Sequence, residues 1–309
     1  MKRILTLTLA VVFCLGVCAC AAKKPAESEV DVPQRQTETG DAAKKAILVV
    51  SFGTSYNETR AVTIEAIESA ITKAFPEFDV RRAFTSQIII DKLKTRDGLE
   101  IDNVTQAMER LIDEGYGTLV VQPTHVMNGY EYDEMVDAIE PYRDSFSQLV
   151  YGKPLLSDEA DYDSMVKILT DETAQYNTEV TPRDTAIVFM GHGTEHPAND
   201  TYALLQQKLL DAGFENYLVG TVEAEPNLED VMDAAKSLGV SKVVLLPLMI
   251  VAGDHASNDM AGDEEGSWKT EFKGEGFEVE CVLKGLGEYP AVQEMFVSHA
   301  RAAVEELSK

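Results

Sequence analysis

A stretch that occurs twice along the chain decides the fold. It reads Ala46-Ile47-Leu48-Val49-Val50-Ser51-Phe52-Gly53-Thr54 in the first half and Ala186-Ile187-Val188-Phe189-Met190-Gly191-His192-Gly193-Thr194 in the second. Each copy is an apolar run of the length of a strand, ended by a glycine turn, and such runs are typical of parallel strands that are covered on both faces. Each copy is therefore predicted to be a buried strand.

The match between the halves continues further along the chain. Residues 117–123 followed by 128–131 match residues 241–247 followed by 252–255, and a polar stretch at 177–184 separates the halves. Apolar runs alternate with helical patterns in both halves, for example a predicted helix at residues 58–75 that is closed by Pro76.

This organisation indicates an α/β protein of two similar three-layer α/β/α lobes with parallel sheets. We predict that the lobes comprise residues 44–180 and 181–309, are related by a pseudo-twofold and face one another across a cleft.

The first 20 residues have the pattern of a secretory signal. Lys2 and Arg3 precede an apolar run at residues 4–17, which is too short to span a membrane. The segment Val17-Cys18-Ala19-Cys20 resembles the bacterial lipobox, in which a cysteine after a small residue is acylated. We assign lipidation to Cys20, with Cys18 or simple cleavage after Ala19 as the alternatives.

Residues 21–43 lack apolar periodicity and are predicted to be a flexible tether. The protein is therefore expected to be exported, as a periplasmic or extracytoplasmic lipoprotein that touches the membrane only through its lipid anchor. A homo-oligomer is compatible with the sequence.

Composition and missing motifs exclude several classes of function. The chain has 27 basic and 53 acidic side chains, a formal net charge of -26, which would repel nucleic acid. The sequence contains neither a P-loop nor a Gly-x-Gly-x-x-Gly motif. We therefore expect no nucleic-acid partner and no nucleotide cofactor.

Three side chains of the second half are predicted to stand at strand ends. His192, Glu223 and His255 follow the apolar runs at 186–191, 217–222 and 243–248. Ligands of α/β sheets bind at the carboxyl ends of strands, and two imidazoles with a carboxylate suit a divalent first-row transition metal. Glu223 has an alternative interpretation as a carboxylate at a helix start, because Asn227 looks like an N-cap.

In the first half, the repeat places Phe52 where the second half has His192, and Glu131 where it has His255. His125 precedes Glu131 in the same loop. Both are expected to face the cleft.

Several motifs, in order, resemble the anaerobic cobalt chelatases of the CbiK type, which are class II chelatases like ferrochelatase. They lie at residues 47–56, 82–86, 128–132, 188–193 and 246–260, and the last contains Gly253-Asp254-His255-Ala256-Ser257-Asn258-Asp259-Met260. The resemblance runs from about residue 45 to the carboxyl end. It implies the bilobal chelatase fold and ATP-independent insertion of Co²⁺ into the tetrapyrrole sirohydrochlorin, in cobalamin biosynthesis.

The resemblance also implies roles for particular residues. His192 and His255 match the histidines that bind the metal and accept protons, and the acidic partner matches Glu223 or, in some members, Glu131. We further expect substrate contacts from Phe52, Thr85, His125 and Glu131. Candidate basic groups for the acidic substrate are Arg60, Arg81, Arg82, Lys92 and Arg96. Fe²⁺ and Ni²⁺ are alternative metals, because these ligand types do not discriminate between them.

The signal-like amino terminus departs from the cytoplasmic members of the family. It leaves open a second function, that of an exported tetrapyrrole (haem) or metal-binding protein in iron or haem handling.

Overall fold

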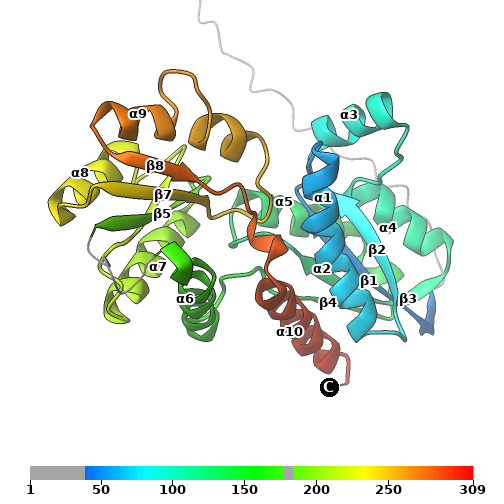
Figure 1. The fold of residues 1–309 in the computed structure, drawn as a ribbon. Coiled ribbons are helices and arrows are strands. Elements are labelled where there is room, and N and C mark those ends of the chain that lie inside the picture. The colour runs from blue at the N-terminus through cyan, green and yellow to red at the C-terminus, as the bar shows by residue number, and fades with distance from the viewer. Residues whose placement is uncertain (1–38, 177–183, 309) are drawn as a thin grey trace, which may run out of the picture. The chain divides into compact units, whose positions relative to one another are not determined.

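Two parallel sheets of four strands each form the framework of the part of the chain that the computed structural model describes, residues 39–176 and 184–308 (Figure 1). The first sheet has the order β2-β1-β3-β4, with β1 (Asp41–Ser51), β2 (Asp79–Phe84), β3 (Tyr116–Pro123) and β4 (Gln148–Tyr151). The second has the order β6-β5-β7-β8, with β5 (Thr185–Gly191), β6 (Tyr217–Thr221), β7 (Lys242–Pro247) and β8 (Glu278–Cys281). Cys20 and the rest of the predicted signal lie outside the described residues.

Helices connect the strands in both halves. In the first half these are α1 (Asn57–Val62), α2 (Ile64–Ala74), α3 (Gln87–Asp97), α4 (Val104–Asp113), α5 (Tyr130–Ile139) and α6 (Glu159–Thr173). In the second half they are α7 (Asp200–Asp211), α8 (Leu228–Leu238), α9 (Trp268–Gly274) and α10 (Pro290–Glu306). None of the helices in the described ranges is long and apolar enough to cross a membrane.

The two sheets have the same topology, which confirms the predicted α/β fold and its internal repeat. The repeated stretch forms β1 in one half and β5 in the other, and each is paired in parallel on both sides. The registers correspond as well, because Val50 of β1 pairs with Pro123 and Met190 of β5 pairs with Pro247. Residues 46–51 and 185–191 are buried, and burial of each large aliphatic side chain contributes about 1.5–3 kcal/mol.

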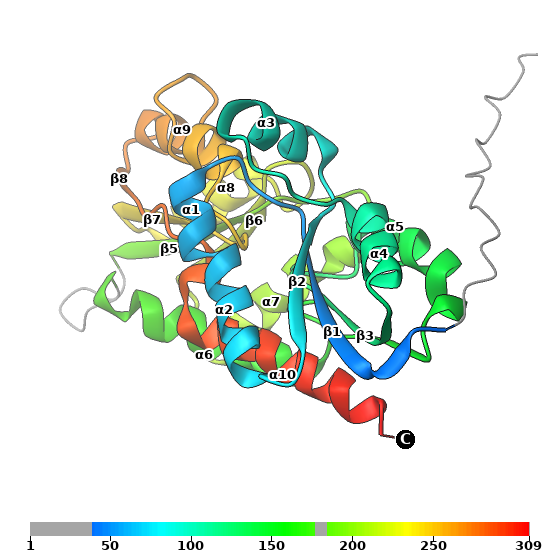
Figure 2. The same ribbon diagram turned by 90° about the vertical axis from the view of Figure 1, so that its right-hand side faces the viewer.

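The last helix of the chain packs on the first sheet. Helix α10 contacts α2, β3 and β4, and Figure 2 shows it crossing beside the C-terminal end of α2. Helix α6, which ends the first half, packs against α7 of the second half. One hydrophobic core therefore contains side chains from both halves, including Ile67, Leu169, Leu205 and Phe296.

A polar contact accompanies this exchange of helices. His299 of α10 is buried, and its Nε2 lies 2.8 Å from Oδ1 of Asp161 in α6. Its Nδ1 lies 3.1 Å from the carbonyl oxygen of Lys153. Both ring nitrogens therefore face acceptors, which ties α10 to the start of α6.

The predicted helix at residues 58–75 is two helices, because the chain breaks at Thr63. Thr63 is buried and has a ψ of -82°, and its hydroxyl donates to the carbonyl oxygen of Thr59 at 2.6 Å. Local bonds of this kind from a β-branched polar residue compete with regular helical pairing. Apolar periodicity alone does not reveal such a break.

Candidate metal centre

The candidate metal centre lies at the carboxyl edge of the second sheet. His192 directly follows β5, Glu223 comes two residues after β6 ends at Thr221, and His255 lies in the segment after β7. Because β6, β5 and β7 are parallel neighbours, their carboxyl ends meet at one edge. One ligand atom from each of His192, Glu223 and His255 lies within 4.8 Å of the others. The structure thus brings together the three residues that we predicted to form one site.

Backbone pairing beyond the strand ends holds Glu223 beside His192. The Glu223 amide donates to the His192 carbonyl oxygen at 2.9 Å. Gly193 has a φ of +85°, and a Cβ atom there would lie 2.7 Å from the backbone nitrogen of Ala224. A glycine is therefore needed for the chain to turn this close to the Glu223 loop.

Glu223 is not part of the helix that follows it. Helix α8 begins after Asn227, whose side chain accepts hydrogen bonds from the amides of Glu229 and Asp230. The acidic residues of its first turn are Glu229 and Asp230, whereas Oε2 of Glu223 lies 3.7 Å from Nδ1 of His192. The alternative interpretation of Glu223 as a carboxylate in a helix start is therefore wrong.

The His192 ring presents one free nitrogen. Its Nδ1 lies 2.9 Å from the carbonyl oxygen of Gly193. A carbonyl oxygen only accepts, so we assign the ring proton to Nδ1, which leaves the Nε2 lone pair available to a metal ion. The rings of His192 and His255 meet edge to face, with centroids 4.7 Å apart.

The His255 ring is oriented by a carboxylate that the sequence analysis did not single out. His255 precedes a π-helical turn, Ala256–Met260, and its Nδ1 lies 2.7 Å from Oδ2 of Asp259. A carboxylate on one ring nitrogen fixes the proton there and makes the other nitrogen a better ligand. Turns of this kind occur frequently at functional sites. The four-residue spacing between His255 and Asp259 is the only sequence signal for this contact.

We expect Asp259→Asn to weaken Co²⁺ binding by about 10- to 100-fold, the usual effect of losing a partner behind a metal ligand. The substitution preserves the size of the side chain but removes the charge that orients His255. Isothermal titration with Co²⁺ measures the change. Asp263→Asn is a suitable control, because Asp263 pairs with Lys269 rather than with a histidine. Unchanged affinity in Asp259→Asn would mean that Asp259 does not support the site.

His125 and Glu131 are neighbours on the first-half side of the site. His125 follows β3, Glu131 lies in the first turn of α5, and their Nε2 and Oε2 atoms are 3.9 Å apart. Burial lowers the pKa of His125 to about 4. Burial raises the pKa of the Glu131 carboxyl, the charge of His192 acts in the opposite direction, and Glu134 raises it further. Glu131 therefore lies within electrostatic reach of His192 in the other half of the chain.

Phe52 and Thr85 follow the adjacent strands β1 and β2. The Thr85 amide donates to the Ser51 carbonyl oxygen at 2.9 Å, which places Thr85 beside the end of β1. Phe52 is 47% exposed although it is a large apolar side chain. The Thr85 hydroxyl is buried and has no hydrogen-bond partner among the described residues. Both features are consistent with the predicted substrate contacts, which remain predictions.

Two contacts join the halves near the metal centre. The Tyr56 hydroxyl donates to Oδ1 of Asp254, the residue before His255, at 3.0 Å. His196 stacks edge to face on Tyr130, and its Nε2 lies 3.4 Å from Oδ2 of Asp133. The loops that carry His192 and His255 are therefore each linked to the first half.

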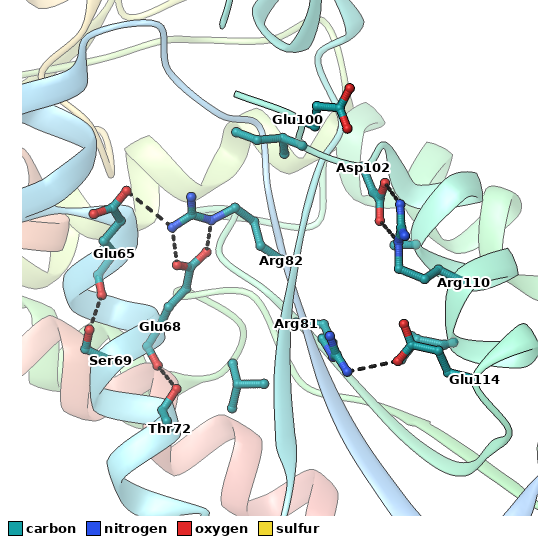
Figure 3. A pocket seen from close by; sticks show the side chains of 14 residues that line it. Glu65, Glu68, Ser69, Thr72, Arg81, Arg82, Glu100, Asp102, Arg110 and Glu114 are labelled. Carbon is teal, nitrogen blue, oxygen red and sulfur yellow. Dashed lines mark hydrogen bonds and ion pairs between the residues drawn. The ribbon is translucent and has the colours of Figure 1, made fainter. Parts of the chain in front are cut away.

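The predicted basic groups on β2 do not line the metal centre. Arg81 and Arg82 lie instead in a groove of about 800 Å³ between α2, β2 and α4, which contains none of the predicted metal ligands. Figure 3 shows that the arginines of this groove are paired with carboxylates: Arg82 with Glu65 and Glu68, Arg81 with Glu114, and Arg110 with Asp102. Their charges are thus largely compensated within the groove.

The remaining predicted basic groups lie around the first helix. Arg60 is buried and bonds to Glu65 and Asn57, and Arg96 bonds to Asp97. Lys92 and Arg96 line a pocket of about 400 Å³ that also contains Tyr56. Two of the five predicted groups, Lys92 and Arg96, therefore share a pocket with Tyr56, which contacts Asp254.

The fold is that of the chelatases. SirB from Bacillus subtilis, solved with Fe³⁺, has a TM-score of 0.59 to this structure at 17% sequence identity, over 86% of this chain and 98% of that chain. This likeness concerns the fold alone, and His192, Glu223 and His255 form a cluster within it. The class of protein, a metal chelatase, is shown by the family and by the relatives at the level of sequence.

The particular family follows from the sequence comparisons. The family described as cobalt chelatase (CbiK) matches residues 45–305, and the chain belongs to this family, as its motifs predicted. A sirohydrochlorin cobaltochelatase of Salmonella typhimurium is 41% identical over 261 residues, which cover 84% of this chain and 97% of that relative. Sirohydrochlorin cobaltochelatase CbiKC of Nitratidesulfovibrio vulgaris is 34% identical over 266 residues, covering 85% of this chain and 92% of that relative.

Proposed function

We propose that this protein inserts Co²⁺ into sirohydrochlorin without a nucleotide, using His192, Glu223 and His255 to hold the ion. The observation that carries the proposal is the convergence of two imidazoles and one carboxylate at the edge of a parallel sheet. Membership of the cobalt chelatase family supports the reaction, and the names of the two curated relatives support the substrate.

The chemistry of metallation explains why imidazoles suit this site. Two pyrrole N–H bonds break as the ion enters the macrocycle, so two protons must be accepted nearby. A group that titrates near neutral pH can first bind the ion as a neutral base and then accept a proton when the ion has left. His192 and His255 each offer an imidazole ring, and the two rings are in contact.

The choice of Co²⁺ rests on the family and not on the ligands. Two imidazoles and a carboxylate also bind Fe²⁺ and Ni²⁺, and Ni²⁺ binds most nitrogen and oxygen sites more tightly than Co²⁺ does. Affinity therefore cannot identify the metal that the protein inserts. Parallel metallation assays with the three ions identify it by comparing the rates of insertion.

Anaerobic mixing of the purified protein with sirohydrochlorin and Co²⁺ tests the proposed activity. The absorbance change on metallation should be accelerated over the reaction without protein. Tight tetrapyrrole binding with no acceleration would contradict the proposal and favour an exported tetrapyrrole or metal-binding protein in iron or haem handling.

The proposal includes export and anchoring through Cys20. The support is the sequence pattern of residues 1–20, in which a short apolar run follows two basic residues and precedes the lipobox-like segment. An acyl chain at this position would hold the chelatase unit at the outer face of the membrane through the chain that precedes β1. The predicted end of the tether at residue 43 is too late, because β1 begins at Asp41.

Cys20→Ser should abolish incorporation of a labelled fatty acid into the full-length protein in bacterial cells, whereas Cys18→Ser should leave most of it. The reason is that the acyl chain is attached to the sulfur of the cysteine that becomes the mature amino terminus. Gel fluorescence of the immunoprecipitated protein measures incorporation. Loss of label in Cys18→Ser alone would assign the anchor to Cys18, and no label in the wild-type protein would favour simple cleavage.

A further inference from the structure

The His125 side chain is buried, and both of its ring nitrogens lack a hydrogen-bond partner among the described residues. Its side chain is 6% exposed. Leaving a buried polar group unpaired costs about 1–3 kcal/mol. A buried group of this kind in a folded protein calls for an explanation.

The backbone around His125 is well fixed, so its placement is not a consequence of a loose loop. The His125 carbonyl oxygen accepts from the Leu155 amide at 2.9 Å, and the Val126 carbonyl oxygen accepts from the Leu156 amide at 2.8 Å. The ring is therefore held in the interior by the fold itself.

Among the described residues, Glu131 places its carboxylate beside this ring. The distance from Nε2 of His125 to Oε2 of Glu131 is 3.9 Å, and an N–H···O hydrogen bond is about 2.9 Å long. The Glu131 side chain is 49% exposed, so it is free to turn inward. A movement of about 1 Å would form the bond.

Glu131 lies on the side of the first half that faces the metal centre. It is in the first turn of α5, between Tyr130 and Asp133, which both contact His196 of the other half. Its carboxyl lies close enough to His192 for the two groups to interact electrostatically. Glu131 thus borders the metal centre from the first half, with His125 directly behind it.

We propose that His125 is a positioning residue for metal insertion, which holds the Glu131 side chain in place at the first-half side of the metal centre. This inference rests on the proposed function, because it concerns the same reaction. His125 would act by holding Glu131 and would contact neither the metal nor the macrocycle.

A neutral imidazole is suited to this task. Burial keeps His125 uncharged at neutral pH, because its pKa is lowered to about 4. One ring nitrogen can donate to the Glu131 carboxylate, and in the other tautomer that nitrogen can accept from the protonated carboxylic acid. His125 can therefore hold Glu131 in both protonation states without adding a charge that would neutralise the carboxylate.

The test compares His125→Leu with His125→Gln in the anaerobic metallation assay. Leucine fills the space but cannot form a hydrogen bond, whereas glutamine can both donate and accept. We expect kcat to fall by about 10- to 100-fold in His125→Leu, the effect of misplacing a reacting group by about 1 Å. His125→Gln should restore at least part of this loss. Co²⁺ affinity should stay within about 2-fold of wild type in both variants, because the ligands lie in the other half.

A double-mutant cycle separates positioning from a purely structural role. If His125 acts through Glu131, His125→Leu should have almost no further effect on kcat in a Glu131→Gln background. Equal losses in the two backgrounds would overturn the proposal, as would wild-type kcat in His125→Leu. If the wild-type protein itself does not accelerate metallation, the proposed function fails. Thermal unfolding of each variant identifies any loss that comes from misfolding.

Discussion

Cobalt insertion is expected to fall by at least about 100-fold in His255→Ala and in His192→Ala. Each substitution removes a proposed ligand for the ion and a proposed proton acceptor, and loss of a general base alone typically costs about 10²- to 10⁴-fold. The rate of sirohydrochlorin metallation, measured anaerobically at saturating Co²⁺, gives the effect. Saturation matters because it separates loss of the base from weaker binding of the ion.

Both variants should fold normally. The side chains of His192 and His255 are 47% and 33% exposed, and surface substitutions usually change stability by no more than about 0.5 kcal/mol. Denaturant unfolding should therefore give midpoints close to that of the wild type. A variant with the wild-type metallation rate would remove its histidine from the site.

The second large effect is expected from Glu223→Gln, which should lower Co²⁺ affinity by at least about 100-fold. Loss of a residue that only hydrogen-bonds to a metal ligand typically weakens metal binding by about 10- to 100-fold. Glu223 is itself a proposed ligand, so its loss should have at least the larger effect. Glutamine keeps the shape of the side chain but loses the charge, so the comparison isolates the carboxylate. Titration calorimetry with Co²⁺ measures the change.

Glu225→Gln is the matched control. Glu225 lies on the same loop and is also exposed, but the metal cluster contains Glu223 and not Glu225. Its variant should bind Co²⁺ like the wild type. Equal losses in the two variants would indicate a general effect of negative charge rather than coordination by Glu223.

Much of the fold follows from the sequence because the chain contains the same unit twice. Apolar runs such as 46–51 and 186–191 have few ways to be buried other than as inner strands of a parallel sheet. The exchange of α6 and α10 between the halves was not predicted. Their apolar faces show that they are buried but not against which sheet, because periodicity does not identify the partner of a helix.

The position of the metal centre was predictable for a related reason. The carboxyl ends of neighbouring parallel strands meet at one edge, so residues that follow β5, β6 and β7 had to lie near one another. The support for His255 was not predictable, because its contact with Asp259 depends on a π-helical turn. Nor could the state of His125 be anticipated, since it depends on burial by segments distant in the sequence.

The predicted basic groups show a limit of sequence reasoning. Arg81 and Arg82 lie in the strand where the family motif at residues 82–86 begins, but their guanidinium groups pair with Glu114, directly after α4, and with Glu68 of α2. In a chain with 53 acidic side chains, most arginines find a nearby carboxylate, and only the structure shows which ones do.

The repeat has produced two halves with unlike residues at their strand ends. Phe52 directly follows β1 as His192 directly follows β5, and Glu131 is the first-half counterpart of His255. Both histidines of the metal cluster therefore belong to the second half, while the first half supplies an exposed ring and the pair of His125 and Glu131.

Cobalt X-ray absorption spectroscopy of the Co²⁺-loaded protein tests the proposed coordination of the ion. We expect imidazole scattering from two histidines together with at least one oxygen ligand, and loss of one imidazole in His255→Ala. A spectrum without imidazole scattering, or one that is the same in His255→Ala and in the wild type, would contradict a metal centre formed by His192, Glu223 and His255.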